Sequence, residues 1–231
     1  MDTKIVCRKS IRQDGTTKYK VRLTGRGFSQ IPGKDYTDTY APVAREESWR
    51  LVLAHGIQNQ LTIRLYDIKS TYLNAAVEEE IFVQEPEFTG VRAWRLKKAL
   101  YGLKQSAKVW NDLLQTLLAH TGFLPTPSDP ALFRAHQQVC ASMVDELLCA
   151  LDPDQVEAFE KTLEKHVTLE KKGRLTLDQG MELCWNHEGV LVTRVRMIEE
   201  LAKSHSVTYR ASAPQPVILY EDSLAWPQKE Y

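Results

Sequence analysis

Apolar and polar residues alternate along several stretches of the chain, a pattern typical of β-strands with one buried face. Residues 61–66 (LTIRLY) follow it and predict a half-buried strand. Residues 5–24 predict two strands around a turn at residues 13–16. Cys140–Val144 and Leu147–Leu151 predict a second hairpin, with two carboxylates at its tip. Short strands are also expected in three later segments, at residues 175–177, 182–185 and 190–193.

Other stretches have the longer spacing of amphipathic helices. A helix is expected from about Arg45, with Gly56 near its end, and another over Val109–Leu118. The sequence DPDQ at residues 152–155 has an N-cap residue, Pro at the first helical position and Gln after it, so a helix should follow. A short helix at residues 70–76 and a last helix at 194–205 complete the set. Mixed strand pairs and helices predict an α+β fold with a central antiparallel sheet packed by helices.

Composition is that of an ordinary globular protein: 231 residues, 43% hydrophobic and 26% charged. No apolar run approaches the roughly 18 residues of a membrane helix, and the N-terminus lacks a signal-peptide core. We therefore expect an intracellular protein, cytoplasmic or nuclear, that is not secreted and has no membrane partner. The four cysteines show no paired spacing, so reduced thiols are expected.

The formal net charge is zero, but the charge is unevenly distributed. Residues 1–30 contain eight Lys and Arg against two Asp, and residues 92–108 contain six Lys and Arg with no acid. Such basic patches are suited to phosphate contacts, although a solvated charged face is the commoner meaning of such runs.

Three carboxylates are the candidate functional groups. Asp67 continues the apolar face of the 61–66 strand, where a bare carboxylate must be hydrated, paired or bound to metal. Asp145 and Glu146 lie at the tip of the second hairpin. Taken alone, Asp67 is more simply a helix cap or a solvated turn, and the hairpin an ordinary polar turn.

A series of separated sequence blocks favours a functional role for these carboxylates over the simpler explanations. In order, they are YKVRLTGRGFSQIPGKDYTDTYAPVAREES, DIKSTYLN, EEEIFVQEPEF, RLKKALYGLKQSAKVW, GFLPTPSDPALF, MVDELL, GMEL and MIEELAKSH. From about Ile5 to Pro214 the chain thus resembles the reverse transcriptase of copia-type retrotransposons. The resemblance implies a polymerase palm-and-fingers fold. Residues 1–60 would be partial fingers, 61–193 the palm with finger elements at about 75–105, and 194–231 the start of a thumb or a disordered tail.

The resemblance also implies roles for seven residues. Asp67, Asp145 and Glu146 fall where the family has its catalytic carboxylates, and would bind two Mg²⁺ ions as cofactors. Substrate-binding roles are implied for Lys20 and Arg22 near the triphosphate, Tyr72 under the sugar, and Gln105 facing the template and base. Lys20 and Arg22 are also explained by a cation-protected edge strand, and Tyr72 by a core aromatic. The implied partners are an RNA or DNA template with its primer and deoxynucleoside triphosphates.

The chain departs from the family pattern at three points. The family's Tyr-Val-Asp-Asp hairpin is Met143-Val144-Asp145-Glu146 here, and its Gln-Ala-Pro is Gln105-Ser106-Ala107. The chain is also expected to begin inside the fingers and to stop before a ribonuclease H domain. Two functions are therefore carried forward: an RNA-directed DNA polymerase domain, and a non-catalytic truncated retrotransposon relic that is at most a nucleic-acid-binding module. A sugar- or phosphate-metabolising enzyme has little support, because the sequence has no phosphate-cradling Gly loop.

Overall fold

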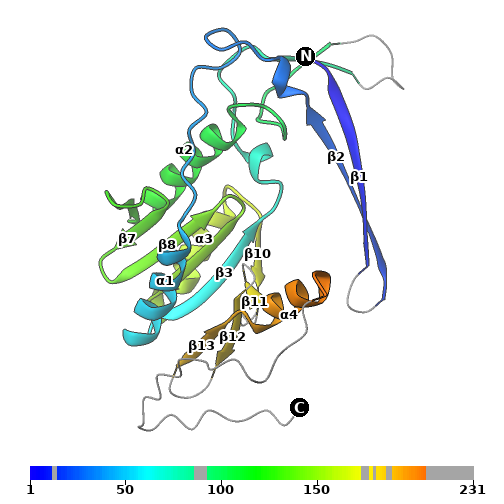
Figure 1. Ribbon diagram of the computed structural model, residues 1–231. Helices are drawn as coiled ribbons and strands as arrows, with labels where there is room; N and C mark the ends of the chain where they lie inside the picture. Colours follow the sequence, from blue (N-terminus) through cyan, green and yellow to red (C-terminus); the bar gives the residue numbers. More distant parts are fainter. Residues whose placement is uncertain (12–14, 86–92, 173–176, 179–180, 186–188, 207–231) are drawn as a thin grey trace.

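The computed structural model describes residues 1–11, 15–85, 93–172, 177–178, 181–185 and 189–206 (Figure 1). Half of the turn expected at 13–16 lies outside these residues, as do parts of the strand expected at 175–177 and of the EEEIFVQEPEF block. So does the expected tail beyond Ser206.

A six-stranded antiparallel sheet forms the centre of the fold, as the sequence predicts (Figure 1). Its strand order is β10-β3-β9-β8-β7-β6. The strands are β3 (Thr62–Ile68), β6 (Leu124–Pro125), β7 (Leu132–Ala135), β8 (Gln138–Met143), β9 (Glu146–Leu151) and β10 (Leu169–Lys172). Because β10 and β9 flank β3 directly, residues far apart in sequence meet at the end of β3.

Both faces of this sheet are covered. Helices α2 (Ser106–Ala119) and α3 (Val156–Glu164) pack on one face, through a core that includes Tyr66 of β3. Helix α1 (Glu46–Gln58) and residues 181–185 of a smaller sheet pack on the other, through a core that includes Leu65. Leu65 and Tyr66 are 5% and 0% exposed, so the prediction of a half-buried strand is wrong at the end of β3. The reason is tertiary: the neighbouring residues of one strand are buried by different layers.

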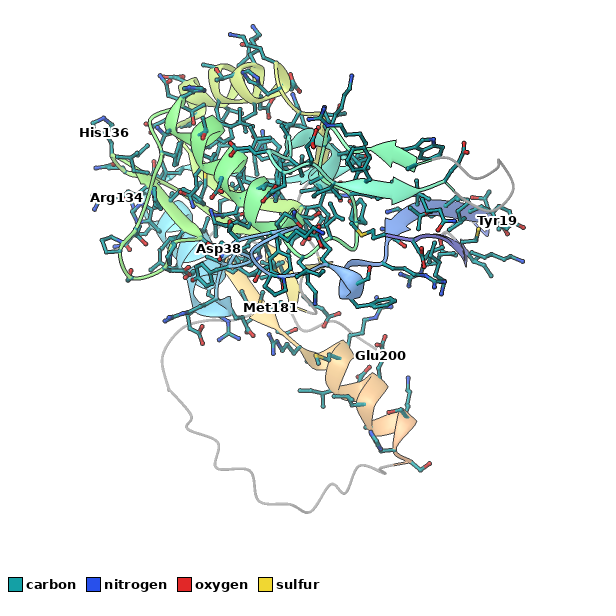
Figure 2. The ribbon with its side chains drawn as sticks, turned by 90° about the horizontal axis from the view of Figure 1, so that it is seen from above. Tyr19, Asp38, Arg134, His136, Met181 and Glu200 are labelled. Atoms are coloured by element: carbon teal, nitrogen blue, oxygen red, sulfur yellow. The ribbon has the colours of Figure 1, made fainter. Side chains whose placement is uncertain are left out.

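Within the described residues, three smaller sheets accompany the central one. A long ribbon is formed by β1 (Thr3–Ile11) and β2 (Thr17–Gly25). The others are β4 (Phe82–Gln84) with β5 (Ala93–Arg95), and β11 (Leu177–Asp178) with β12 (Met181–Trp185) and β13 (Val190–Thr193). The ribbon extends away from the central sheet, and Tyr19 on it is 73% exposed (Figure 2).

The ribbon is joined to the body by backbone contacts between glycines. Gly25 N–H donates to the carbonyl of Tyr101 at 2.8 Å, and Gly27 N–H donates to that of Gly102 at 3.0 Å. A Cβ at Gly102, where φ is +91°, would lie 2.1 Å from the Gly25 carbonyl oxygen. Only glycine permits so close an approach in this conformation.

The predicted helices form with small changes at their ends. The short helix expected at 70–76 is the 3₁₀ turn Thr71–Asn74, and the last helix is α4 (Val195–Ser204). Two further 3₁₀ turns cover Gly27–Ser29 and Pro153–Gln155. The expected N-cap, Asp152, precedes the 3₁₀ turn Pro153–Gln155 rather than α3 itself, and it makes no side-chain cap hydrogen bond. Among the residues described, no helix is long and apolar enough to span a bilayer.

Candidate active site

Strand register brings Asp67 and Glu146 together. Asp67 is the residue before the last of β3, and it pairs directly with Glu146, the first residue of β9. On its other side Asp67 pairs with Glu170 of β10. Directly paired residues of antiparallel strands project from the same face of the sheet, with Cβ atoms about 4.5–5.5 Å apart. Three carboxylates therefore form one row across three strands.

Asp145 lies beside this row in the β8–β9 turn. The turn consists of Val144 and Asp145, since Met143 and Glu146 are already paired. Glu146 is thus the first strand residue, and the prediction of both carboxylates at the tip is wrong for it. The reason is that Glu146 pairs with Met143 and Asp67 at once, which draws it into the ladder.

Two hydrogen bonds fix this turn. The N–H of Ile68, next to Asp67, donates to the carbonyl of Asp145 at 2.7 Å. The indole N–H of Trp110 donates to the carbonyl of Val144 at 2.8 Å. Val144 itself has φ of +58°, a strained conformation for a β-branched residue. Such strain persists only where the surroundings enforce it, and it is often found at functional sites.

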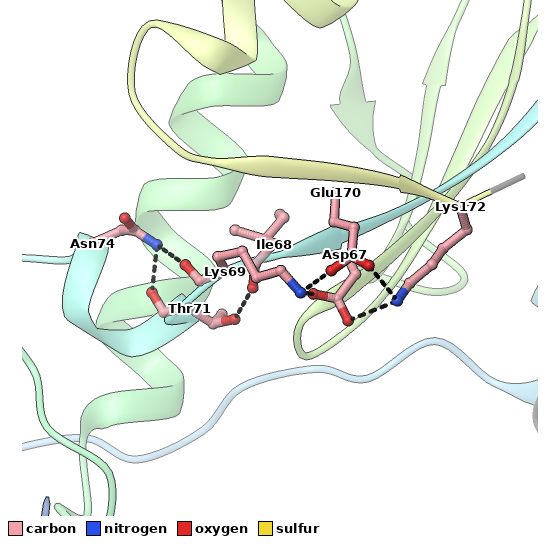
Figure 3. Close-up of polar contacts among 7 residues, drawn as sticks. All are labelled: Asp67, Ile68, Lys69, Thr71, Asn74, Glu170 and Lys172. Carbon is pink, nitrogen blue, oxygen red and sulfur yellow. Dashed lines mark hydrogen bonds and ion pairs between the residues drawn. The ribbon is translucent and has the colours of Figure 1, made fainter. Parts of the chain in front are cut away.

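The Asp67 carboxylate is held in ion pairs (Figure 3). Its Oδ1 lies 3.3 Å from Nζ of Lys69, and its Oδ2 lies 3.5 Å from Nζ of Lys172. Both ammonium groups also contact Glu170. The Asp67 side chain is 23% exposed, so solvent reaches the group.

Two tyrosines connect the carboxylates to the ribbon. The rings of Tyr72 and Tyr101 meet edge to face, with centroids 4.8 Å apart. Burial raises the pKa of both hydroxyls, and the negative charge of Asp145 raises each pKa further. The guanidinium of Arg22, on β2, lies 5.7 Å from the Tyr101 ring centroid, within cation–π range. Tyr72 and Tyr101 are thus close enough to feel the charge of Asp145, and Arg22 lies over Tyr101.

The remaining expected residues lie in different surroundings. Lys20 is exposed on the same face of β2 as Arg22, farther along the ribbon, and it pairs in register with Arg8. Gln105 is only 1% exposed. Its amide oxygen accepts a hydrogen bond from Gln30 at 3.0 Å, and its amide nitrogen donates to the carbonyl of Asp35 at 2.8 Å.

Glu170, Lys172, Lys69 and Tyr101 were not identified as site residues from sequence. The segment LEKK of β10 has no apolar alternation, so nothing in its pattern indicates a strand. Lys69 and Tyr101 lie inside blocks that resemble the family, and that was the one available signal.

Comparison with known proteins identifies the family of the chain. A model of the reverse transcriptase (RNA-dependent DNA polymerase) family matches residues 1–219. The chain belongs to this reverse transcriptase family.

Relatives of this reverse transcriptase are copia-type Pol polyproteins, which confirms the resemblance seen in the sequence. The retrovirus-related Pol polyprotein from transposon RE2 of Arabidopsis thaliana is 36% identical over 131 residues, covering 54% of this chain and 9% of the relative. That from transposon RE1 is 27% identical over 240 residues, covering 96% and 16%. That from transposon TNT 1-94 of Nicotiana tabacum is 32% identical over 131 residues, covering 53% and 10%. The chain thus spans 16% or less of the length of these relatives.

Reverse transcriptases generally use divalent metal ions, and the donors here are of the right type. Carboxylate oxygens suit Mg²⁺, and register and the β8–β9 turn bring Asp67, Glu146 and Asp145 to one end of the sheet. Within the described part of the chain, however, no three His, Cys, Asp or Glu side chains are grouped closely enough to hold an ion. The residues fit the metal by donor type, and Asp67 is held by two lysines.

Proposed function

We propose that this domain is an RNA-directed DNA polymerase of copia type, which extends a primer along an RNA or DNA template. In the reaction, the primer 3′-hydroxyl attacks the α-phosphate of a deoxynucleoside triphosphate, and pyrophosphate leaves. The observation that carries the proposal is the pairing of Asp67 with Glu146 across adjacent strands, with the Asp145 backbone bonded to the residue after Asp67.

Asp67, Asp145 and Glu146 would hold two Mg²⁺ ions. When bound, these would stabilise negative charge on the transferring phosphoryl group. The protein would place the other reactant groups. Arg22 and Lys20 on β2 would bind the triphosphate through charge-assisted hydrogen bonds. Tyr72, braced edge-on by Tyr101, would support the sugar and leave no room for a ribose 2′-hydroxyl.

Gln105 would serve the nucleotide site by positioning its neighbours. The side chain of Gln30 bridges to it and also accepts a hydrogen bond from the N–H of Lys104 at 2.8 Å. This buried pair of amides therefore fixes the loop after the ribbon against the start of α2. A polar pair that is fully hydrogen-bonded gives a single arrangement of the backbone.

In this proposal residues 1–60 are partial fingers, residues 61–193 are the palm with finger elements at about 75–105, and α4 belongs to the start of a thumb. The arrangement in Figure 1 supports it, because the β1–β2 ribbon extends away from the central sheet, whereas α4 lies beside the smaller β11–β13 sheet.

Primer extension on poly(rA) with an oligo(dT) primer tests the proposal. Asp67→Asn should reduce Mg²⁺-dependent incorporation by at least a hundredfold, because it removes the central charge of the carboxylate row. Asp152→Asn, the same change at the exposed far end of β9, is the control and should retain activity. Equal activity of the two variants would contradict the proposal.

A second candidate is the non-catalytic, nucleic-acid-binding relic. It is favoured by the Glu at position 146 and by the lysines paired with Asp67. Glu146→Asp distinguishes the two candidates. Incorporation by the unaltered chain establishes a working polymerase, and incorporation only after Glu146→Asp shows a site disabled at one carboxylate. No incorporation by either chain, with nucleic-acid binding retained, supports the non-catalytic relic.

A further inference from the structure

Two lysines bracket the Asp67 carboxylate, one at each oxygen (Figure 3). Lys69 is two residues farther along the same chain segment, whereas Lys172 is on the neighbouring strand β10. Each ammonium group also contacts the Glu170 carboxylate. Two carboxylates and two ammonium groups thus form a closed ring with no net charge.

This ring offsets an electrostatic repulsion between carboxylates in the metal-free protein. Asp67 has a carboxylate as its register partner on both sides, Glu146 and Glu170, and adjacent like charges destabilise each other. The lysines place positive charge between Asp67 and Glu170 without any bound ion. They pair with both oxygens of Asp67, the atoms through which a carboxylate binds a divalent cation.

The ring is also weak enough to open. The side chains of Lys69 and Lys172 are 48% and 37% exposed. Ion pairs this exposed contribute little to stability, because water screens them and the long side chains lose freedom. An ammonium group and a divalent cation repel each other, so both cannot remain close to the same carboxylate.

We infer that Lys69 and Lys172 are tethered counter-ions which stabilise Asp67 in the metal-free protein and compete with divalent metal for it. The inference rests on the proposed function, since it concerns the same carboxylates. Its consequence is that the chain has a lower metal affinity than its carboxylates alone would give, and that the two lysines set this affinity.

The test is direct binding of Mn²⁺ to the full chain, followed by the electron paramagnetic resonance signal of free Mn²⁺. Lys172→Met should bind Mn²⁺ about threefold more tightly, and Lys69→Met with Lys172→Met about tenfold more tightly, as expected for one and two weak ion pairs. Asp67→Asn should remove this site from every variant. Lys161→Met is the matched control: it removes the same charge from an exposed pair with Glu157 on α3, and its affinity should be unchanged.

Thermal unfolding in EDTA supplies a second readout that does not depend on activity. Without metal, the double variant should melt at a lower temperature than the unaltered chain. Added Mn²⁺ should raise the melting temperature of the double variant by more than it raises that of the unaltered chain. Lys172→Gln, which keeps a polar side chain, should show the same direction of change in both measurements.

The outcomes separate this inference from the proposed function. Suppose that Mn²⁺ binds at a site that Asp67→Asn abolishes, and that the double variant binds Mn²⁺ no more tightly than the unaltered chain. This result overturns the competition and leaves the polymerase proposal standing. If no variant, including the double variant, shows binding that depends on Asp67, both the inference and the metal-dependent function fail.

Discussion

Asp129 provides helix α1 with a cap from a distant part of the chain. The residue at the N-cap position, Arg45, makes no side-chain cap hydrogen bond. Instead Oδ2 of Asp129 accepts hydrogen bonds from the Ser48 hydroxyl at 2.5 Å and the Arg45 N–H at 3.3 Å, while Oδ1 accepts one from the Ala131 N–H at 3.0 Å. A carboxylate at this end also interacts favourably with the helix dipole.

Asp129→Asn should lower the free energy of unfolding at pH 7 by about 1–2 kcal/mol, as the loss of a charged cap does. Burial alone would raise the pKa of Asp129, but the hydrogen bonds from Ser48, Ala131 and Arg45 outweigh it and hold the pKa below its ordinary value. The folded pKa is thus below the unfolded one. The stabilisation is present above about pH 4 and is lost as the pH falls through the folded pKa.

Denaturant unfolding between pH 2.5 and 7 measures this effect. The variant should lose stability less steeply in acid than the unaltered chain. Asp152→Asn, at an exposed residue that makes no cap hydrogen bond, is the control and should shift stability by less than about 0.5 kcal/mol. A parallel pH dependence in Asp129→Asn and the unaltered chain would show that the cap contributes nothing.

At the scale of elements, the attachment of the β1–β2 ribbon depends on how closely two backbone segments approach. Gly25 and Gly27 donate to the carbonyls of Tyr101 and Gly102, so these contacts hold the ribbon at the position that brings Arg22 over Tyr101. The Gln30–Gln105 amide pair fixes the loop that follows.

Gly102→Ala should therefore destabilise the ribbon junction by about 3 kcal/mol, from steric overlap with the Gly25 carbonyl added to the cost of positive φ. Gly122→Ala is the matched control, because Gly122 has φ of +86° and nothing lies within 4 Å of its Cβ position. It should cost only about 1 kcal/mol. Hydrogen exchange at the Gly25 and Gly27 amides measures the junction itself. Protection of these amides that is unchanged by Gly102→Ala would refute the close approach.

At the scale of the whole molecule, the neutral chain has strongly separated charge. Because strand residues alternate between faces, Arg8 and its register partner Lys20 share a face of the ribbon with Arg22, while Lys9 lies on the opposite face with Tyr19. The cationic face is the one that continues to Tyr101 and the carboxylates.

Removing two charges from that face should weaken single-stranded nucleic-acid binding and its salt dependence together. On a single strand, the slope of log K against log salt changes by about 0.7 for each phosphate that the protein no longer neutralises. Arg8→Gln with Lys20→Gln should thus reduce the magnitude of the slope by about 1.4. Lys9→Gln should leave it nearly unchanged. Fluorescence anisotropy with a labelled oligonucleotide over a salt series gives both slopes, and equal effects from the two faces would contradict this orientation.

The sequence by itself determined the elements that have a clear period. The helices, the β1–β2 ribbon and the β8–β9 hairpin follow from local alternation and spacing, which are visible along the chain. The quoted blocks gave the family, and with it Asp67, Asp145 and Glu146. Short strands such as β7 and β10 had no such signal, because their formation depends on neighbours that are distant in sequence.

Only the tertiary structure decided how the site is composed. Register, which the sequence does not state, placed Glu146 and Glu170 on either side of Asp67 and brought Lys172 to its second oxygen. The same long-range pairing buried Gln105 against Gln30 and gave α1 its cap from Asp129. Local patterns record which face of an element is apolar. They do not record which charge will lie opposite which, because that depends on the pairing of segments dozens of residues apart.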